Sequence, residues 1–509
     1  MLKPNSVISK FSRRVGYGLK PGERVPEDPV TWAVEQIEKI PQLGIPQPDG
    51  SDLLESESFA ANQDYLPIPE MSDAVELWGK LHNRWLDINE LASEMPPHEW
   101  QDLMYREVYF RRADIVQWRD CLVRSSTAAH GQCGVFEKFW TFWVNHFAVH
   151  ARHFTKLFYG PHTRIIREHM LGNFSDLARA AILNPGMLEY LDNIFSSGPN
   201  SLMVKNRWDP GATINENLGR EVLELHTIGV ESGYSQSDVT EMAYALTGWG
   251  IYSGKKDERE RLFIRGQPFG AYFEPRRHEP GSRNIFGIEI SQNDSGMSQA
   301  PLAIDMLSRR DETIERLSRK LATYFISDEP PQGAIDEISK VWKATDGSLP
   351  DIHRVVIEQC FKHIEETKKL TTPEEWLFTL YRTTGLPVPA SAPGQPGLLI
   401  NKLCEELGQP YDEVPQPDGW PTNSASWLSS AFLERRFRFV HFLANGRDIT
   451  VQNAEIVKEN INRDYDAALI GSVDPSNLIA TIEGRSPVFG ALKRDLFMTY
   501  ACAPQFLYT

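Results

Sequence analysis

Two segments of the sequence carry residue types and spacings from which a catalytic or metal-binding site could be built. The first runs from Phe136 to His150 and combines aromatic side chains with His146 and His150, four residues apart. On a helix, imidazoles at positions i and i+4 lie on one face and can bind one metal ion. The alternative is that each imidazole makes a hydrogen bond to a backbone carbonyl of the core. The sequence leaves both interpretations open.

The second segment is a predicted helix over residues 215–227, with a polar stripe made by Asn217, Glu221 and Glu224. Arg220 flanks this stripe, and His226 lies at the border of the packing face. Glu221, Glu224 and Arg220 are the candidate catalytic residues, because two neighbouring carboxylates can act as acid and base. The alternative is a solvated face held by an ion pair between Glu216 and Arg220.

If the two segments pack together, they predict a metal site of mixed His and carboxylate ligands. The candidate ligands are His146, Glu221, His226, His150 and His278. Such a set suits Zn, Fe or Mn better than Ca, which prefers oxygen alone. Asn145, Asn217 and Arg220 would orient ligands or substrate. Glu221 and His226 are five residues apart, about 140° around an α-helix, so they can share an ion only if the helix ends or bends between them.

The elements that must position these residues are mainly helices. Hydrophobic periodicity predicts a mainly α fold, a large multi-helix globular bundle with a small irregular or β excursion at 250–297 that contains His278. One helix is expected from Pro29 to Ile40 and another from Glu137 to His150. The predicted regions are an extended N-terminal segment with one helix (1–70), a helical core carrying the site (71–249), the excursion (250–297), a helical region (298–384), a Pro/Gly-rich linker (385–397) and a C-terminal helical region (398–509).

Composition restricts the partners and the compartment. The chain has 509 residues, 41% of them hydrophobic, and a formal net charge of −16. An acidic excess repels nucleic-acid backbones and anionic lipids, so we expect neither nucleic acid nor membrane as a partner, and instead a small molecule or a protein. No run approaches the ~18 apolar residues that span a bilayer. The sequence contains no P-loop or dinucleotide-binding pattern, which argues against a nucleotide cofactor.

The five cysteines have no CxxC spacing, which indicates free thiols in a reducing compartment. The N-terminus has basic residues but no apolar segment of the kind that follows them in a signal peptide. A cytoplasmic location is therefore predicted. An exported protein whose signal has been removed would show the same pattern.

The sequence resembles the bacterial domain-of-unknown-function 1800 family over nearly its whole length. The residues that carry the resemblance include Trp143-Val144-Asn145-His146-Phe147, Asn215-Glu216-Asn217, Arg220-Glu221, Glu224-Leu225-His226-Thr227 and Leu246-Thr247-Gly248-Trp249. The chain departs from the family pattern at Arg310-Asp311, where the family tends to have His-Pro. The resemblance marks the two chemical segments as family signatures and implies no particular reaction.

The leading hypothesis is a metal-dependent enzyme, either a hydrolase or an oxidoreductase, with its site between helices 136–150 and 215–226. The first alternative is a non-catalytic binding or assembly protein, in which the same residues form a structural hydrogen-bond network. The second is a metal-free site in which Glu221 and Glu224 act as acid and base.

Overall fold

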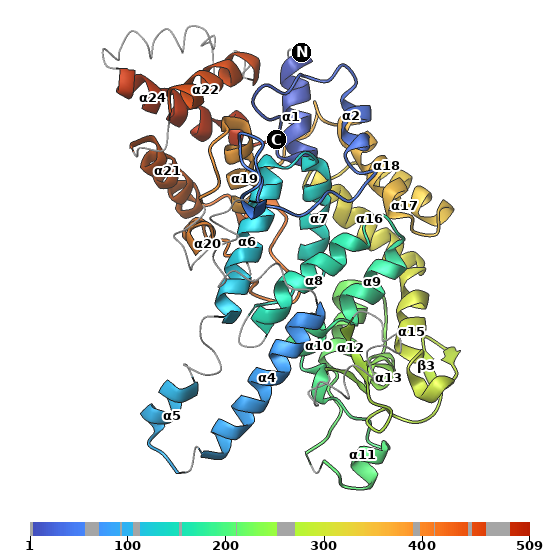
Figure 1. Ribbon diagram of the computed structural model, residues 1–509. Coiled ribbons are helices and arrows are strands. Elements are labelled where there is room, and N and C mark those ends of the chain that lie inside the picture. The colour runs from blue at the N-terminus through green and yellow to red at the C-terminus, as the bar shows by residue number, and fades with distance from the viewer. Residues whose placement is uncertain are drawn as a thin grey trace.

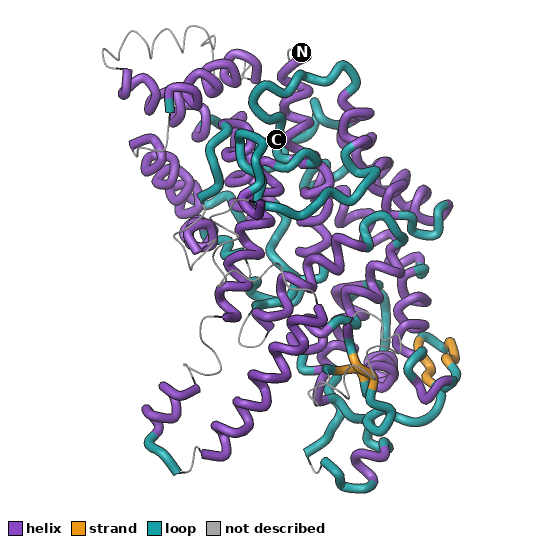
Figure 2. Tube along the Cα trace, viewed as in Figure 1, coloured by secondary structure: helices purple, strands orange, loops and turns teal. Residues whose placement is uncertain are grey.

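Helices make up most of the chain in the computed structural model (Figures 1 and 2). The structure describes residues 4–55, 71–91, 94–104, 112–151, 155–209, 211–251, 270–389, 398–411, 413–445, 450–464 and 489–509. In these ranges the strands form two antiparallel pairs. The mainly α fold expected from the sequence is confirmed.

Five α-helices precede the segment that holds the first group of candidate residues in the described ranges, and two of them, α1 and α6, pack on it. They are α1 (Pro4–Gly16), α2 (Pro29–Glu35), α4 (Met71–Glu90), α5 (Pro97–Met104) and α6 (Arg112–His130). α2 begins at the predicted Pro29, where the Asp28 side chain accepts hydrogen bonds from two backbone N–H groups of the first turn. It ends at Glu35 rather than at the predicted Ile40.

Helix α7 (Gly134–His146) lies at the centre of the fold (Figure 1). Every residue of α7 except Asn145 is buried, as expected for a helix that is apolar nearly all round. Helix α1 crosses it closely, because a Cβ atom on Gly134 would lie 2.6 Å from the carbonyl oxygen of Gly16. This crossing requires glycine at position 134.

Three further helices follow α7 and pack around it. They are α8 (Lys156–Glu168), α9 (Phe174–Ile182) and α10 (Pro185–Tyr190). Asn184 accepts a hydrogen bond from the backbone N–H of Gly186, and Pro185 is the first residue of α10. Asparagine before a helix and proline in its first turn both favour a helix start. Residues 184–186 thus form the turn between α9 and α10.

The second chemical segment forms a short helix that changes type. After α11 (Leu202–Lys205), α12 (Asn217–Glu221) continues directly into a π-helical turn, Val222–His226. Helix α13 (Gln236–Leu246) then packs on α12, and Ser235 and Asp238 form a capping box at its start.

The described part of the predicted excursion and the residue before it form four short strands. β1 (Trp249–Gly250) pairs with β2 (Tyr272–Phe273), and β3 (Arg283–Ile285) pairs with β4 (Ile288–Ile290). Phe286 and Gly287 join β3 to β4 with positive φ angles of 53° and 75°. That geometry makes a tight hairpin turn, so the excursion contains the β structure expected from the sequence. Residues 252–269 of the predicted excursion lie outside the described residues.

The remaining helices form two groups. Helices α15 (Gln299–Ser308), α16 (Asp311–Phe325), α17 (Gln332–Ala344) and α18 (Leu349–Lys362) complete the main core with α7 and α9. Helices α19 (Pro373–Thr384), α20 (Leu398–Leu407), α21 (Ser430–Asn445), α22 (Val451–Asp464), α24 (Phe489–Cys502) and α25 (Pro504–Leu507) form a second core with α6. Among the described helices, none is long and apolar enough to cross a membrane.

Candidate functional site

Helix α7 ends at His146, so the predicted continuation to His150 is wrong. The carbonyl oxygen of Phe147 accepts a hydrogen bond from Nε2 of His162, 2.8 Å away. A continuing helix would have offered that carbonyl to the N–H of Ala151. Beyond the helix end, Nδ1 of His150 lies 2.7 Å from the carbonyl oxygen of Val414. His146 and His150 therefore do not share a helix face.

The α-helix changes to a π-helical turn between Glu221 and His226. Such a change was the condition under which these two residues could face the same side of the helix. Hydrogen bonds in a π-helix join residues i and i+5, so these two residues lie one turn apart. The hydroxyl of Thr227 also donates to the carbonyl oxygen of Val222, at 2.6 Å, and ends the turn. His226 is fully buried, whereas Glu221 is half-buried.

The two chemical segments pack against each other, as the functional interpretation required. Nε2 of His146 lies 3.3 Å from the backbone carbonyl oxygen of His226, and the two ring centroids are 6.0 Å apart. Phe147 also packs on His226, with 5.2 Å between ring centroids. The end of α7 and the end of the π-helical turn thus form one buried junction.

Lys320 of α16 completes this junction. Its Nζ atom lies 3.0 Å from Nδ1 of His146. Since the amine donates this hydrogen bond, Nδ1 carries the lone pair, and Nε2–H donates to the His226 carbonyl. Burial holds the pKa of His146 well below its usual value, and the charge of Lys320 lowers it further. The His146 ring is therefore neutral, with both nitrogens engaged.

Lys320 itself is half-buried and electrostatically perturbed. Burial lowers its pKa to about 7, Arg316 lowers it further, and Asp418 opposes the shift. Arg316 lies one turn earlier on α16 and donates from Nη1 to the carbonyl oxygen of Thr227, at 3.2 Å. Sequence reasoning missed both residues, because they look like ordinary basic residues of an amphipathic helix.

The predicted catalytic carboxylates lie at the outer edge of the junction. Glu224 accepts hydrogen bonds from Arg220, at 3.3 Å, and from the hydroxyl of Tyr234. The expected ion pair between Arg220 and Glu216 is also present, at 3.7 Å. Burial raises the pKa of Glu221, and the charge of Glu224 raises it further.

Asp418 connects the carboxylate edge to Lys320. It is exposed, and its charge raises the pKa of both Glu221 and Lys320. The two groups are therefore close enough to the same carboxylate to feel its field. Their pKa values shift in opposite directions, toward neutrality, as in many acid–base pairs of enzymes.

The loop that carries Asp418 is fixed by Asn145, the one residue of α7 that is not buried. The Asn145 amide donates to the carbonyl oxygen of Trp420 at 2.9 Å and accepts from its N–H at 2.7 Å. Gly419, the residue before Trp420, has a φ of 83°. A Cβ atom on Gly419 would lie 2.3 Å from the backbone carbonyl oxygen of Asn145. This approach requires glycine.

We expect Gly419→Ala to lower the free energy of unfolding by about 1–3 kcal/mol, because the added methyl group meets a backbone atom and φ is positive. Thermal and denaturant melts measure the loss. Gly333→Ala is the matched control, since a Cβ atom on Gly333 would meet nothing within 4 Å. Equal melting curves for the two variants would contradict the assignment of Gly419 as a tight anchor.

The structure places His278 apart from this junction. Its Nδ1 lies 2.7 Å from the carbonyl oxygen of Thr247, and its Nε2 lies 2.9 Å from Oε1 of Gln299. The side chain thus joins the excursion to the ends of α13 and α15. Within the described ranges, no three His, Cys, Asp or Glu side chains are grouped so that they could hold a metal ion.

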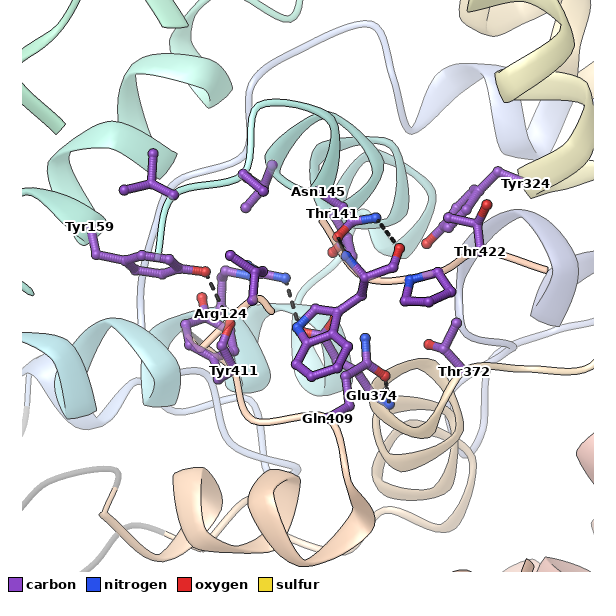
Figure 3. Close-up of a pocket in the computed structure, with 16 residues that line it drawn as sticks. Arg124, Thr141, Asn145, Tyr159, Tyr324, Thr372, Glu374, Gln409, Tyr411 and Thr422 are labelled. Atoms are coloured by element: carbon purple, nitrogen blue, oxygen red, sulfur yellow. Dashed lines mark hydrogen bonds and ion pairs between the residues drawn. The ribbon is translucent and has the colours of Figure 1, made fainter. Parts of the chain in front are cut away.

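A small polar cavity lies on the other side of Asn145 (Figure 3). Its volume is about 30 Å³, enough for roughly two water molecules. Arg124 lies in its wall and forms an ion pair with Glu374 at 2.9 Å, while Tyr159 and Tyr324 lie on opposite sides in the view. The cavity is too small for a substrate and is best explained as a hydrated part of the core.

The family model described as "Protein of unknown function (DUF1800)" matches residues 10–507 of the chain. No curated protein matches the chain, and no solved structure matches it. The matched range includes every element of the junction, from α7 to the loop at Trp420.

Proposed function

The chain belongs to the DUF1800 family, whose description assigns no reaction, and from the site itself we propose that the protein is an enzyme that performs acid–base chemistry on a small molecule. The site is the junction of α7, the π-helical turn and α16. The observation that carries the proposal is the hydrogen bond of 3.0 Å from the Lys320 amine to the neutral His146 ring. An amine held in this way at a half-buried position is a typical enzymatic proton donor or base.

The roles follow from the pKa shifts of two groups. Glu221 takes a proton from the substrate as its carboxylate, because its raised pKa makes it a better base than an exposed glutamate. Lys320 delivers a proton as its ammonium, because its pKa of about 7 makes it a far stronger acid than an ordinary lysine. His146 orients the Lys320 amine. Arg220 and Glu224 set the charge beside Glu221.

The low pKa of Lys320 can be tested without a substrate. At pH 7 we expect a dilute amine-reactive reagent, such as acetic anhydride, to modify Lys320 at least tenfold faster than Lys402. The exposed Lys402 amine has a raised pKa, since it forms an ion pair with Glu405 at 2.8 Å. Mass spectrometry of peptides after brief labelling measures the two rates.

The pH dependence of labelling makes this test decisive. The rate at Lys320 should rise through about pH 7 and then level off, whereas the rate at Lys402 should keep rising above pH 9. If Lys320 reacts more slowly than Lys402 at every pH, the acid–base proposal fails. The non-catalytic alternative, a structural hydrogen-bond network, would then be favoured.

A metal-dependent enzyme is the second candidate, and one observation favours it. Neither ring nitrogen of the fully buried His226 makes a close hydrogen bond within the described part of the chain, and only a weak interaction with the His146 backbone acts on the ring, so the other nitrogen could bind an ion. Zn, Fe and Mn are the metals to examine. Elemental analysis tests this candidate on the native protein, on His226→Ala and on His98→Ala, a control at an exposed histidine. Loss of metal from His226→Ala alone supports a metal-dependent enzyme.

A further inference from the structure

Two cationic side chains on one face of α16 lack an acidic partner among the described residues. Arg316 donates to the backbone of Thr227, and Lys320 donates to the ring of His146. Other basic residues of the same region are paired: Arg319 lies 3.5 Å from Glu315, and Lys343 lies 2.7 Å from Asp311. Neither of these half-buried cations has a carboxylate within ion-pair distance in the described ranges, so the cost of burying its charge is not offset there.

Arg316 has hydrogen-bond donors that are not used within the described part of the chain. A guanidinium has five N–H donors, and the hydrogen bond to Thr227 uses one of them. No nitrogen of Arg316 or Lys320 is among the buried polar atoms that lack a partner. The remaining donors of Arg316 are therefore accessible to solvent or to a ligand. Gly229 makes room for the Arg316 stem, since a Cβ atom there would lie 2.7 Å from Cδ of Arg316.

The buried imidazole of His226 lies close to these two cations. Neither of its ring nitrogens makes a close hydrogen bond within the described ranges, although the backbone of His146 acts on the ring as a weak acceptor, and the side chain is fully buried. A neutral imidazole has one N–H donor, and leaving it unpaired costs free energy. The charges of Lys320 and Arg316 act directly on this ring. Arg316 and Lys320 thus place two positive charges close to the buried His226 ring.

The one carboxylate whose charge acts on Lys320 does not form an ion pair with it in the described ranges. Asp418 acts on Lys320, but it is exposed, so solvent and salt screen its charge. Glu221 and Glu224 lie at the outer edge, where Arg220 balances them. The deep side of the junction is therefore positive and the outer side is negative.

We infer that Arg316 and Lys320 bind an oxyanion, the carboxylate or phosphate group of a small-molecule substrate, with the His226 N–H as a third donor. A guanidinium matches the two oxygens of such a group, and the ammonium supplies a point charge beside it. This inference rests on the proposed function, because it assigns the substrate class of the same site. It also explains why the site keeps cations without an internal partner.

Calorimetric titration of the full-length chain with inorganic phosphate and, separately, with succinate tests the inference in phosphate-free buffer. We expect saturable binding of one of the two anions at one site per chain, and the anion that binds identifies the source of the oxyanion. Arg316→Gln should weaken that binding at least tenfold, and Arg316→Lys should weaken it less. Arg319→Gln is the matched control, since Arg319 lies on the exposed side of the same helix and should bind like wild type.

Two results would overturn the inference: no binding of either anion, or equal weakening by Arg316→Gln and Arg319→Gln. Circular dichroism shows whether each variant is folded, and Arg316→Lys replaces Arg316→Gln if the latter unfolds. The outcome is separable from that of the proposed function. Anion binding together with ordinary labelling of Lys320 would keep the binding site and reject the catalyst. Rapid labelling of Lys320 without anion binding would support the acid–base role and reject the anion-binding site.

Discussion

Replacing Glu137 by Gln is expected to lower the free energy of unfolding by about 3–5 kcal/mol, because it leaves a buried arginine without its counter-charge. Glu137 lies in the first turn of α7, and its two carboxylate oxygens each lie 2.7 Å from a guanidinium nitrogen of Arg167. The exposed fractions of Glu137 and Arg167 are 3% and 1%. The Arg167 guanidinium also lies over the ring of Trp140, 4.6 Å from its centroid.

Chemical denaturation of wild type and Glu137→Gln measures this loss. Glu168→Gln is the control, because Glu168 pairs with Arg164 on the same helix, α8, at 2.9 Å, but with half of its side chain exposed. That change should cost less than about 1 kcal/mol. The double variant Glu137→Met, Arg167→Met should recover most of the stability, since it removes both charges. Equal losses for Glu137→Gln and Glu168→Gln would show that burial does not govern these ion pairs.

The same ion pair shows what the sequence of α7 could and could not predict. The all-round apolar pattern predicted a buried helix, and α7 is buried. Glu137 and Lys138 stood within that pattern as unexplained charges. Their partners, Arg167 and Glu375, come from α8 and α19. Which distant charge reaches a buried position depends on helix packing, and periodicity within one helix carries no information about it.

The candidate site was predictable in part for the same reason. His146 and His226 could be singled out because they interrupt apolar surfaces, and they do meet. Lys320 could not be distinguished from Arg319, its neighbour on α16. Lys320 is half-buried and Arg319 is exposed, and this difference depends on which face of α16 packs toward α7. The position of His150 was missed because a side chain from α8, His162, ends α7.

Lys320→Met is expected to lower kcat/KM by about 10²–10⁴-fold, the usual contribution of a positioned proton donor. A screen of carboxylate- and phosphate-bearing compounds would provide the substrate. In the wild type, kcat/KM should rise with pH as Glu221 ionises, at a pH above the usual glutamate value of 4.5. It should fall as pH rises through about 7, because Lys320 then loses the proton that it must donate.

The variants assign the two limbs of that profile. Lys320→Met should remove the fall near pH 7 and leave the rise, whereas Glu221→Gln should remove the rise and leave the fall. Lys343→Met serves as the control, because Lys343 is an exposed residue of α17 paired with Asp311. If Lys320→Met lowers the rate but keeps the fall near pH 7, another group delivers the proton. Lys320 would then be a positioning residue for His146 rather than a catalytic residue. Two pH profiles with unchanged limbs would reject Glu221 and Lys320 together as the groups whose ionisation sets those limbs.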